Sequence, residues 1–120
     1  MDTMFVPGEI LQKAFSGLSQ DDANAIIQKG QVRTFPPWTV ICREGAYESS
    51  FYIILSGDVQ VSKVINESDE KILKSLHAGD FFGEMAIIHN APRAATITTT
   101  QATTVLEISK EDFSTLLENS

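Results

Sequence analysis

Residues 51–65, FYIILSGDVQVSKVI, predict two β-strands joined by a tight turn. Phe51–Leu55 is a short apolar run, and Ser56-Gly57-Asp58 supplies the small and polar residues that tight turns favour. Valines then recur with a period of two at Val59 and Val61, which indicates a second strand that continues to Ile65. The centre of the chain is therefore β-structure, and the flanking residues decide which kind.

Similar short strands separated by turn residues are expected on both sides. Residues 32–35 end at Pro36-Pro37, residues 38–42 alternate, and residues 72–76 follow a polar hairpin tip. Residues 96–108 are rich in threonine and other β-branched residues, which favour strands. Seven or eight short strands, with turns about every eight to twelve residues, predict a mainly β domain, an antiparallel sandwich or roll. No helix separates successive strands, so a parallel α/β fold is not expected.

Helical patterns flank the predicted strands. Within residues 1–30, apolar residues fall at helical spacing, Ser19 is the expected N-cap of a second helix, and Gly30 is its stop. Ser109 is the expected cap of a further helix. The 120 residues are expected to form a single domain of N-terminal helices 1–30, a β-roll 31–108 and the start of a C-terminal helix 109–120.

Composition excludes several classes of protein. Apolar residues make up 42% of the chain, too many for a disordered segment, and no apolar run approaches the roughly 20 residues that cross a membrane. Nine basic against sixteen acidic residues give a net charge of −7, which disfavours direct contact with nucleic acid or with an anionic membrane. No secretory signal opens the sequence. The single cysteine, Cys42, fits a reducing compartment, so a cytoplasmic location is expected.

Residues 82–97, FGEMAIIHNAPRAATI, depart from the strand pattern. Gly83 permits a close approach between backbone and ligand. Glu84–Ile88 is helix-capable but too short to be stable by itself, and a helix N-terminus offers free backbone N–H groups to an anion. Arg93 presents a planar fork of donors that matches phosphate, and Glu84 can accept hydrogen bonds from sugar hydroxyls. Together these residues predict a nucleotide site.

This segment resembles the phosphate-binding cassette of the cyclic nucleotide-binding domain family, and residues 82–97 satisfy every fixed position of the family pattern. Further similarity lies in Gly45, in the strand and turn 51–57, and in the run 79–82. The resemblance covers almost the whole chain. It implies an antiparallel β-roll, a jelly roll of the double-stranded β-helix type, with short flanking helices.

The resemblance also implies roles for individual residues. Glu84 would bind the ribose 2′-hydroxyl, and Arg93 would pair with the cyclic phosphate. Backbone N–H groups would line the phosphate and ribose at Gly83, Met85, Ala86, Ala94 and Ala95. Apolar side chains would flank the purine at Val61, Leu73 and Ile97. Members of the family that prefer cGMP often carry threonine at the position of Ala94, so the alanine favours cAMP.

The implied function is that of a regulatory module. The domain would bind a cyclic nucleotide, cAMP more tightly than cGMP, as its ligand and without a cofactor. Occupancy would be transmitted through the C-terminal helix that begins near Lys110 to an effector domain or partner subunit outside this chain. No serine, cysteine or lysine has a recognisable activating neighbour, and no carboxylate pair stands out as acid and base, so no enzymatic activity is expected.

Two observations also have a purely structural interpretation, without a ligand. Glu84 and Arg93 could form a purely structural salt bridge, and Val61, Leu73 and Ile97 would face the core of any β-roll. The chain would then be a nucleotide-free interaction module with the same fold.

A cupin-like metal enzyme is the third alternative, because metal-binding cupins share a related jelly roll. His77 and His89 are the only histidines, and they do not form a ligand-spaced pair. The spacing therefore does not suggest a metal site. Cys42 lies in an alternating strand and is expected to be a buried apolar residue.

Overall fold

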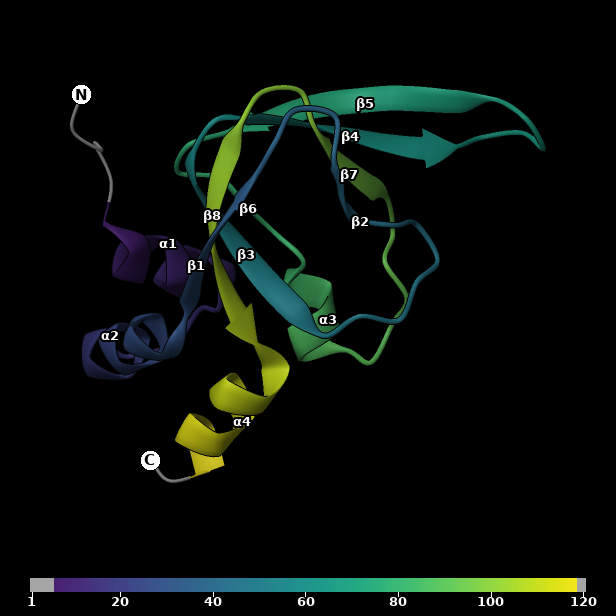
Figure 1. Ribbon diagram of the computed structural model, residues 1–120. Helices are drawn as coiled ribbons and strands as arrows, with labels where there is room; N and C mark the ends of the chain where they lie inside the picture. Colours follow the sequence, from purple (N-terminus) through teal and green to yellow (C-terminus); the bar gives the residue numbers. More distant parts are fainter. Residues whose placement is uncertain (1–5, 119–120) are drawn as a thin grey trace.

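The computed structural model describes residues 6–118 (Figure 1). Its strands form two four-stranded sheets in which every pairing is antiparallel. The first sheet contains, in spatial order, β1 (Gln31–Phe35), β8 (Thr103–Ser109), β3 (Ser50–Ser56) and β6 (Phe81–Phe82). The second contains β2 (Val40–Cys42), β7 (Thr96–Thr99), β4 (Asp58–Val64) and β5 (Glu70–His77). The predicted mainly β, antiparallel fold is confirmed, while the two-residue strand β6 was not apparent from the sequence.

The described residues also form α1 (Pro7–Ala14), α2 (Gln20–Lys29), α3 (Glu84–Ile88) and α4 (Lys110–Glu118). The predicted caps are present, because Ser19 Oγ accepts the Asp22 N–H and Ser109 Oγ accepts the Asp112 N–H, both at 3.0 Å. Within residues 6–118, no helix is long and apolar enough to cross a membrane. Residues 1–5 and 119–120 of the predicted terminal segments lie outside the described residues.

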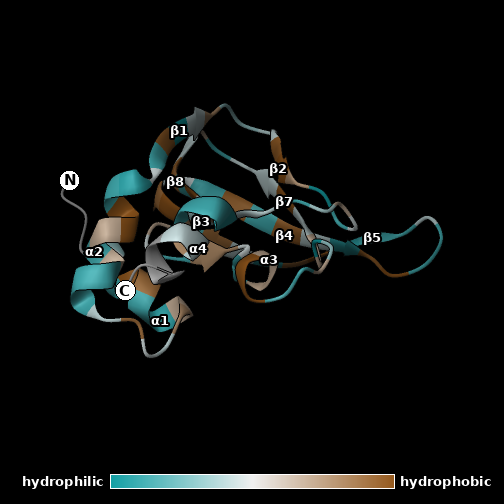
Figure 2. Cartoon of the chain, turned by 90° about the horizontal axis from the view of Figure 1, so that it is seen from below, coloured by the Kyte–Doolittle hydropathy of each residue, from teal (hydrophilic) through white to brown (hydrophobic). Residues whose placement is uncertain are grey.

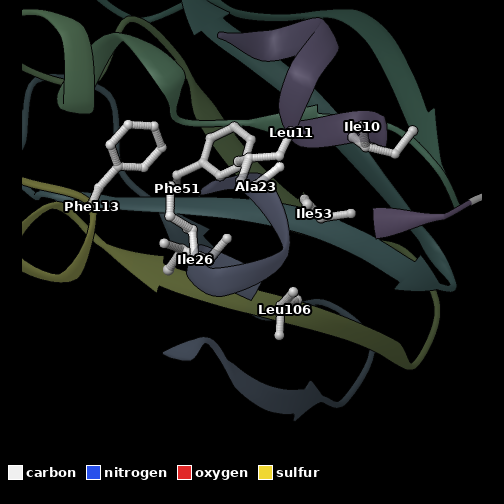
Figure 3. Close-up of a cluster of buried hydrophobic side chains, with 9 residues drawn as sticks. Ile10, Leu11, Ala23, Ile26, Phe51, Ile53, Leu106 and Phe113 are labelled. Atoms are coloured by element: carbon white, nitrogen blue, oxygen red, sulfur yellow. The ribbon is translucent and has the colours of Figure 1, made fainter. Parts of the chain in front are cut away.

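Apolar side chains cover both faces of β3, which explains the uninterrupted apolar run at its centre. Neighbouring side chains of a strand point to opposite faces, and hydrophobic residues follow the central strands in Figure 2. One cluster joins β3 and β8 to the helices (Figure 3) through Ile10, Leu11, Ala23, Ile26, Phe51, Ile53, Leu106, Ile108 and Phe113. The other fills the space between the sheets with Cys42, Tyr52, Ile54, Val59, Val61, Phe82, Ile97 and Val105.

Between β3 and β4 the chain passes from the first sheet to the second through a single residue, Gly57. Its φ of +101° lies in the left-handed region, which a residue with a Cβ adopts only at a cost. A Cβ at this position would also lie 2.5 Å from the Ala102 carbonyl oxygen and 2.6 Å from Thr103 Cα. The crossing between the sheets therefore depends on the absence of a side chain for two independent reasons.

We predict that Gly57→Ala destabilises the protein by more than about 2 kcal/mol, because left-handed strain of roughly 1–2 kcal/mol adds to a collision with backbone atoms. Gly17→Ala is the matched control, since Gly17 has a φ of +90° but open space around the position of its Cβ. Urea unfolding of both variants measures the difference. Equal losses of stability in the two variants would show that the close approach of residues 102–103 contributes nothing.

Candidate functional site

A pocket of about 280 Å³ lies between the second sheet and the segment 81–97. Nine of the ten predicted binding residues line it, and Leu73 does not. The lining residues are Cys42, Val61, Lys74, Leu76, Phe81, Phe82, Gly83, Glu84, Met85, Ala86, Ala91, Pro92, Arg93, Ala94, Ala95 and Ile97. The pocket thus has an apolar wall formed by strands and a wall formed by the segment that departs from the strand pattern.

Backbone and side-chain contacts hold Arg93 in place within the segment 81–97. Its N–H donates to the Ala46 carbonyl and its carbonyl accepts the Gly45 N–H, both at 2.8 Å. Its guanidinium donates from Nε to Glu48 Oε1 at 3.1 Å and from Nη2 to the Ser50 carbonyl at 2.8 Å. The loop that precedes β3 and the first residue of β3 therefore hold both the backbone and the guanidinium of Arg93.

The third guanidinium nitrogen of Arg93 is different. Nη1 is buried and has no hydrogen-bond partner within the described residues. Water does not reach it readily either, because Arg93 as a whole is only 7% exposed. A buried donor without a partner is costly and calls for an explanation, and a further group that binds beside it is one such explanation. The geometry therefore presents one free, charged donor at the wall of the pocket.

Gly83 makes room for this donor. The residue has a φ of +92° and immediately precedes α3. A Cβ at Gly83 would lie 2.8 Å from the Ser50 carbonyl oxygen and 2.9 Å from Arg93 Nη1. A side chain at this position would collide with the Ser50 carbonyl and with the guanidinium that this carbonyl binds. Residue 83 therefore has a steric reason to be glycine.

The short helix α3 begins at Glu84 and ends at Ile88, as the sequence predicted. The N–H of Ala86 already donates to the Gly83 carbonyl at 3.1 Å, so it is not free in this structure. Glu84 is half-buried at the pocket, and Met85 is exposed. The carboxylate partner of Arg93 is Glu48 and not Glu84, so the interpretation of Glu84 and Arg93 as a structural salt bridge is wrong.

The apolar wall is built by strand register. Val61 of β4 lies opposite Ile97 of β7, and Ile97 lies opposite Cys42 of β2. Val61 and Ile97 are buried, as expected. Burial raises the pKa of the Cys42 thiol to about 12, so this thiol stays uncharged. The predicted apolar role of Cys42 is confirmed.

Leu73 does not face the core, and that expectation is wrong. It is 52% exposed, because the register of β4 and β5 shifts at this point: Val61 pairs with Lys74, and Ser62 pairs with Ile72. Leu73 is the extra residue of a β-bulge, which turns a side chain away from its regular direction. Lys74 takes its place at the pocket, and a simple alternation of residues could not have revealed this.

Several residues that shape the site could not be identified from the sequence alone. Glu48 and the Ser50 carbonyl bind Arg93, and the Arg93 guanidinium carbon lies 5.9 Å from the centre of the Tyr52 ring. Tyr52 in turn stacks on Phe82, with ring centroids 4.9 Å apart. Glu48 is more than forty residues from Arg93 in the chain, so no local pattern connects the two.

The two histidines lie apart from this pocket. His77 contacts the Asp58 carboxylate at the end of β4 and β5, and the His89 N–H donates to the Met85 carbonyl where α3 ends. The described residues contain no group of three or more histidine, cysteine or carboxylate side chains that could hold a metal ion.

Comparisons with known proteins match this architecture. A family model described as "Cyclic nucleotide-binding domain" matches residues 32–120. The chain is 33% identical over 108 residues to a cAMP-dependent protein kinase regulatory subunit of Mycosarcoma maydis, a match that covers 86% of this chain and 20% of that protein. It is 34% identical over 107 residues to a cGMP-dependent protein kinase of Toxoplasma gondii, covering 89% of this chain and 10% of that protein.

A solved structure shows the same fold at similar identity. The regulatory domain of Toxoplasma gondii PKA, co-crystallised with cAMP, superposes with a TM-score of 0.82 at 34% identity, covering 92% of this chain and 42% of that chain. The chain spans about a fifth of the length of the fungal regulatory subunit. The family model, which matches residues 32–120, covers every strand except the first residue of β1 and includes the whole segment 82–97. The chain therefore belongs to the cyclic nucleotide-binding domain family.

Proposed function

We propose that this chain binds cAMP in the pocket beside Arg93 and acts as a regulatory module. The observation that carries the proposal is the buried Arg93 Nη1, which has no partner within residues 6–118 and lies next to the side-chain-free Gly83. A cyclic phosphate would accept a charge-assisted hydrogen bond from this nitrogen and so relieve the cost of burying it. A ligand without a hydrogen-bond acceptor at this point would leave that cost in place, and a neutral acceptor would form a weaker bond than a phosphate.

The remaining contacts are assigned as the resemblance to the cyclic nucleotide-binding domain family implies. Glu84 stands at the start of α3 and is assigned to the ribose 2′-hydroxyl. The backbone N–H groups of Gly83, Met85, Ala94 and Ala95 are assigned to the phosphate and ribose, and that of Ala86 would join them only by giving up its bond to the Gly83 carbonyl. Val61 and Ile97 form the wall against which the purine would pack. A contact of Leu73 with the base remains a prediction.

The preference for cAMP over cGMP rests on Ala94. This residue lines the pocket directly after Arg93 and offers no hydroxyl to the 2-amino group of guanine. Among the relatives, both cAMP-dependent regulatory subunits and a cGMP-dependent kinase occur, so the choice of base depends on local residues of this kind. We expect cGMP to bind more weakly.

Occupancy of the pocket would be transmitted through α4. Ile87 of α3 packs against the cluster that contains Phe113 of α4. A shift of α3 toward bound phosphate would therefore alter the packing of Phe113, and a ligand that favours one packing shifts the population toward it. Because the chain spans about a fifth of its fungal relative, we place the effector domain or partner subunit outside these residues. The module itself would act in the cytoplasm, without catalysis and without a cofactor.

The first test is calorimetric titration of the chain with cAMP and cGMP. We predict that Arg93→Ala weakens cAMP binding by about ten- to hundredfold, because a hydrogen bond to a charged group contributes roughly 1.5–3 kcal/mol. Arg43→Ala, which removes an exposed arginine outside the pocket, should leave the affinity unchanged. Circular dichroism checks folding, since Arg93 also bonds to the Ser50 carbonyl.

If the wild-type chain binds neither nucleotide, the interpretation as a nucleotide-free interaction module is favoured. If the wild type binds cAMP and Arg93→Ala stays within about twofold of it, the phosphate assignment is wrong.

The role of Glu84 is tested with a ligand that lacks one hydroxyl. Glu84→Ala should lower the affinity for cAMP by about ten- to hundredfold, since a hydrogen bond to a carboxylate contributes roughly 1.5–3 kcal/mol, and should lower the affinity for 2′-deoxy-cAMP much less. Comparing two proteins with two ligands isolates the pair, as in a double-mutant cycle. Glu111→Ala, at an exposed carboxylate of α4, is the control. Equal losses of affinity for the two ligands would show that Glu84 does not bind the ribose 2′-hydroxyl.

Base selectivity is tested at Ala94. Ala94→Thr adds a hydroxyl that can accept one neutral hydrogen bond from the guanine 2-amino group, worth roughly 0.5–1.5 kcal/mol. We predict a two- to tenfold gain in affinity for cGMP, with cAMP nearly unchanged. The ratio of the two affinities at fixed salt is the measurement. An unchanged ratio would mean that residue 94 serves only to permit close approach.

A further inference from the structure

Three side chains form a row across the first sheet, where β8, β3 and β6 are neighbours (Figure 1). In the strand register, Tyr52 of β3 lies opposite Glu107 of β8 and opposite Phe82 of β6. Side chains that oppose each other on neighbouring strands are close enough to interact. The Tyr52 ring stacks on the Phe82 ring, with an interplanar angle of 21°, and the Tyr52 hydroxyl donates to Glu107 Oε2 at 3.2 Å. The ring is therefore held from both sides.

The Arg93 guanidinium lies over this ring. Its central carbon is 5.9 Å from the ring centroid, within the range in which the π face of an aromatic ring attracts a cation. This attraction is stronger where water is excluded, and both Tyr52 and Arg93 are buried. Burial raises the pKa of the Tyr52 hydroxyl, so the cation meets a neutral phenol and not a phenolate.

The hydrogen bonds of Arg93 leave one movement of its guanidinium unrestrained. Nε donates to Glu48 and Nη2 donates to the Ser50 carbonyl, which fixes one edge of the planar group. A planar group held along one edge can still tilt about that edge, and the tilt would displace Nη1, the nitrogen without a partner within residues 6–118. A surface beside the plane is needed to prevent the tilt, and the Tyr52 ring provides one.

Tyr52 itself does not line the pocket beside Arg93. Its influence on a bound ligand must therefore pass through a neighbour. Two of its neighbours line the pocket, Arg93 and Phe82. Of these two, only Arg93 carries a charged donor that is free to bind an anion.

We propose that Tyr52 is a positioning residue for cyclic nucleotide binding: its ring restrains the tilt of the Arg93 guanidinium and so keeps Nη1 in place for the phosphate. This inference rests on the proposed function, because it concerns the arginine assigned to the cyclic phosphate. The ring is the effective part of Tyr52. The hydroxyl holds the ring in place through Glu107, and the stack on Phe82 holds it as well, so phenylalanine should replace tyrosine here.

Titration calorimetry with cAMP tests the proposal with three variants of β3. Tyr52→Leu removes the ring and should weaken binding by about five- to thirtyfold, the range expected for a largely desolvated cation–π contact. Tyr52→Phe keeps the ring and should bind within about twofold of the wild type. Ile54→Ala is the matched control, because Ile54 lies on the same strand face and in the same buried cluster but does not line the pocket. It should lower the free energy of unfolding in urea and leave the affinity unchanged.

A double-mutant cycle shows whether the effect passes through Arg93. In the Arg93→Ala background, Tyr52→Leu should change the remaining affinity by less than about twofold, because no guanidinium is left to position. An equal loss of affinity in both backgrounds would show that Tyr52 acts through Phe82 or through general packing, and would overturn the proposal. A Tyr52→Phe or Ile54→Ala variant that binds as weakly as Tyr52→Leu would also overturn it.

The order of the guanidinium is measured without a ligand by ¹⁵N relaxation of the Arg93 Nε–H, whose NMR signal is assigned by its loss in Arg93→Ala. Its order parameter, which reports fast local motion, should fall in Tyr52→Leu and stay unchanged in Tyr52→Phe and Ile54→Ala. An unchanged order parameter in Tyr52→Leu contradicts the positioning role. This measurement separates two failures: a wild-type chain that binds neither nucleotide refutes the proposed function, while the relaxation data still decide whether Tyr52 positions Arg93.

Discussion

The buried guanidinium of Arg93 is the constraint on which the site depends. A charged group that is only 7% exposed must be paired, and three parts of the chain surround this one. Glu48 and the Ser50 carbonyl bind two of its nitrogens, and Gly83 leaves space beside the third. Removing either partner would leave a buried charge with fewer contacts, and a side chain at Gly83 would collide with the guanidinium. The loop before β3, β3 itself and the segment after β6 are thereby fixed relative to one another.

β3 connects this constraint to the rest of the fold. Its Tyr52 lies under Arg93, stacks on Phe82 and donates to Glu107 Oε2 at 3.2 Å. Burial raises the pKa of the Tyr52 hydroxyl, so it remains a donor. Burial alone would raise the pKa of Glu107, but hydrogen bonds from Arg33, Ser50 and Tyr52 and the positive charge of Arg33 together outweigh it and lower that pKa. A line of contacts therefore runs from the edge strand β1 across β8 and β3 to Arg93.

Much of the fold could be predicted because its causes are local. The turn at Gly57, the caps Ser19 and Ser109, and the boundaries of α3 follow from residues within a few positions of one another. The run Phe51–Leu55 shows no alternation because both faces of β3 are covered. The strand β6 escaped notice because two residues carry no period, and its pairing with β3 is decided at a distance.

The sequence by itself determined the fold class, the flanking helices and the candidate residues Glu84 and Arg93, since these depend on period, turn chemistry and a contiguous motif. Only the tertiary structure decided that Arg93 pairs with Glu48 and that Lys74 and not Leu73 reaches the pocket. These facts depend on strand register and on a bulge. Register is set by packing between segments distant in the chain, and a shift of one residue reverses which side chains face the pocket.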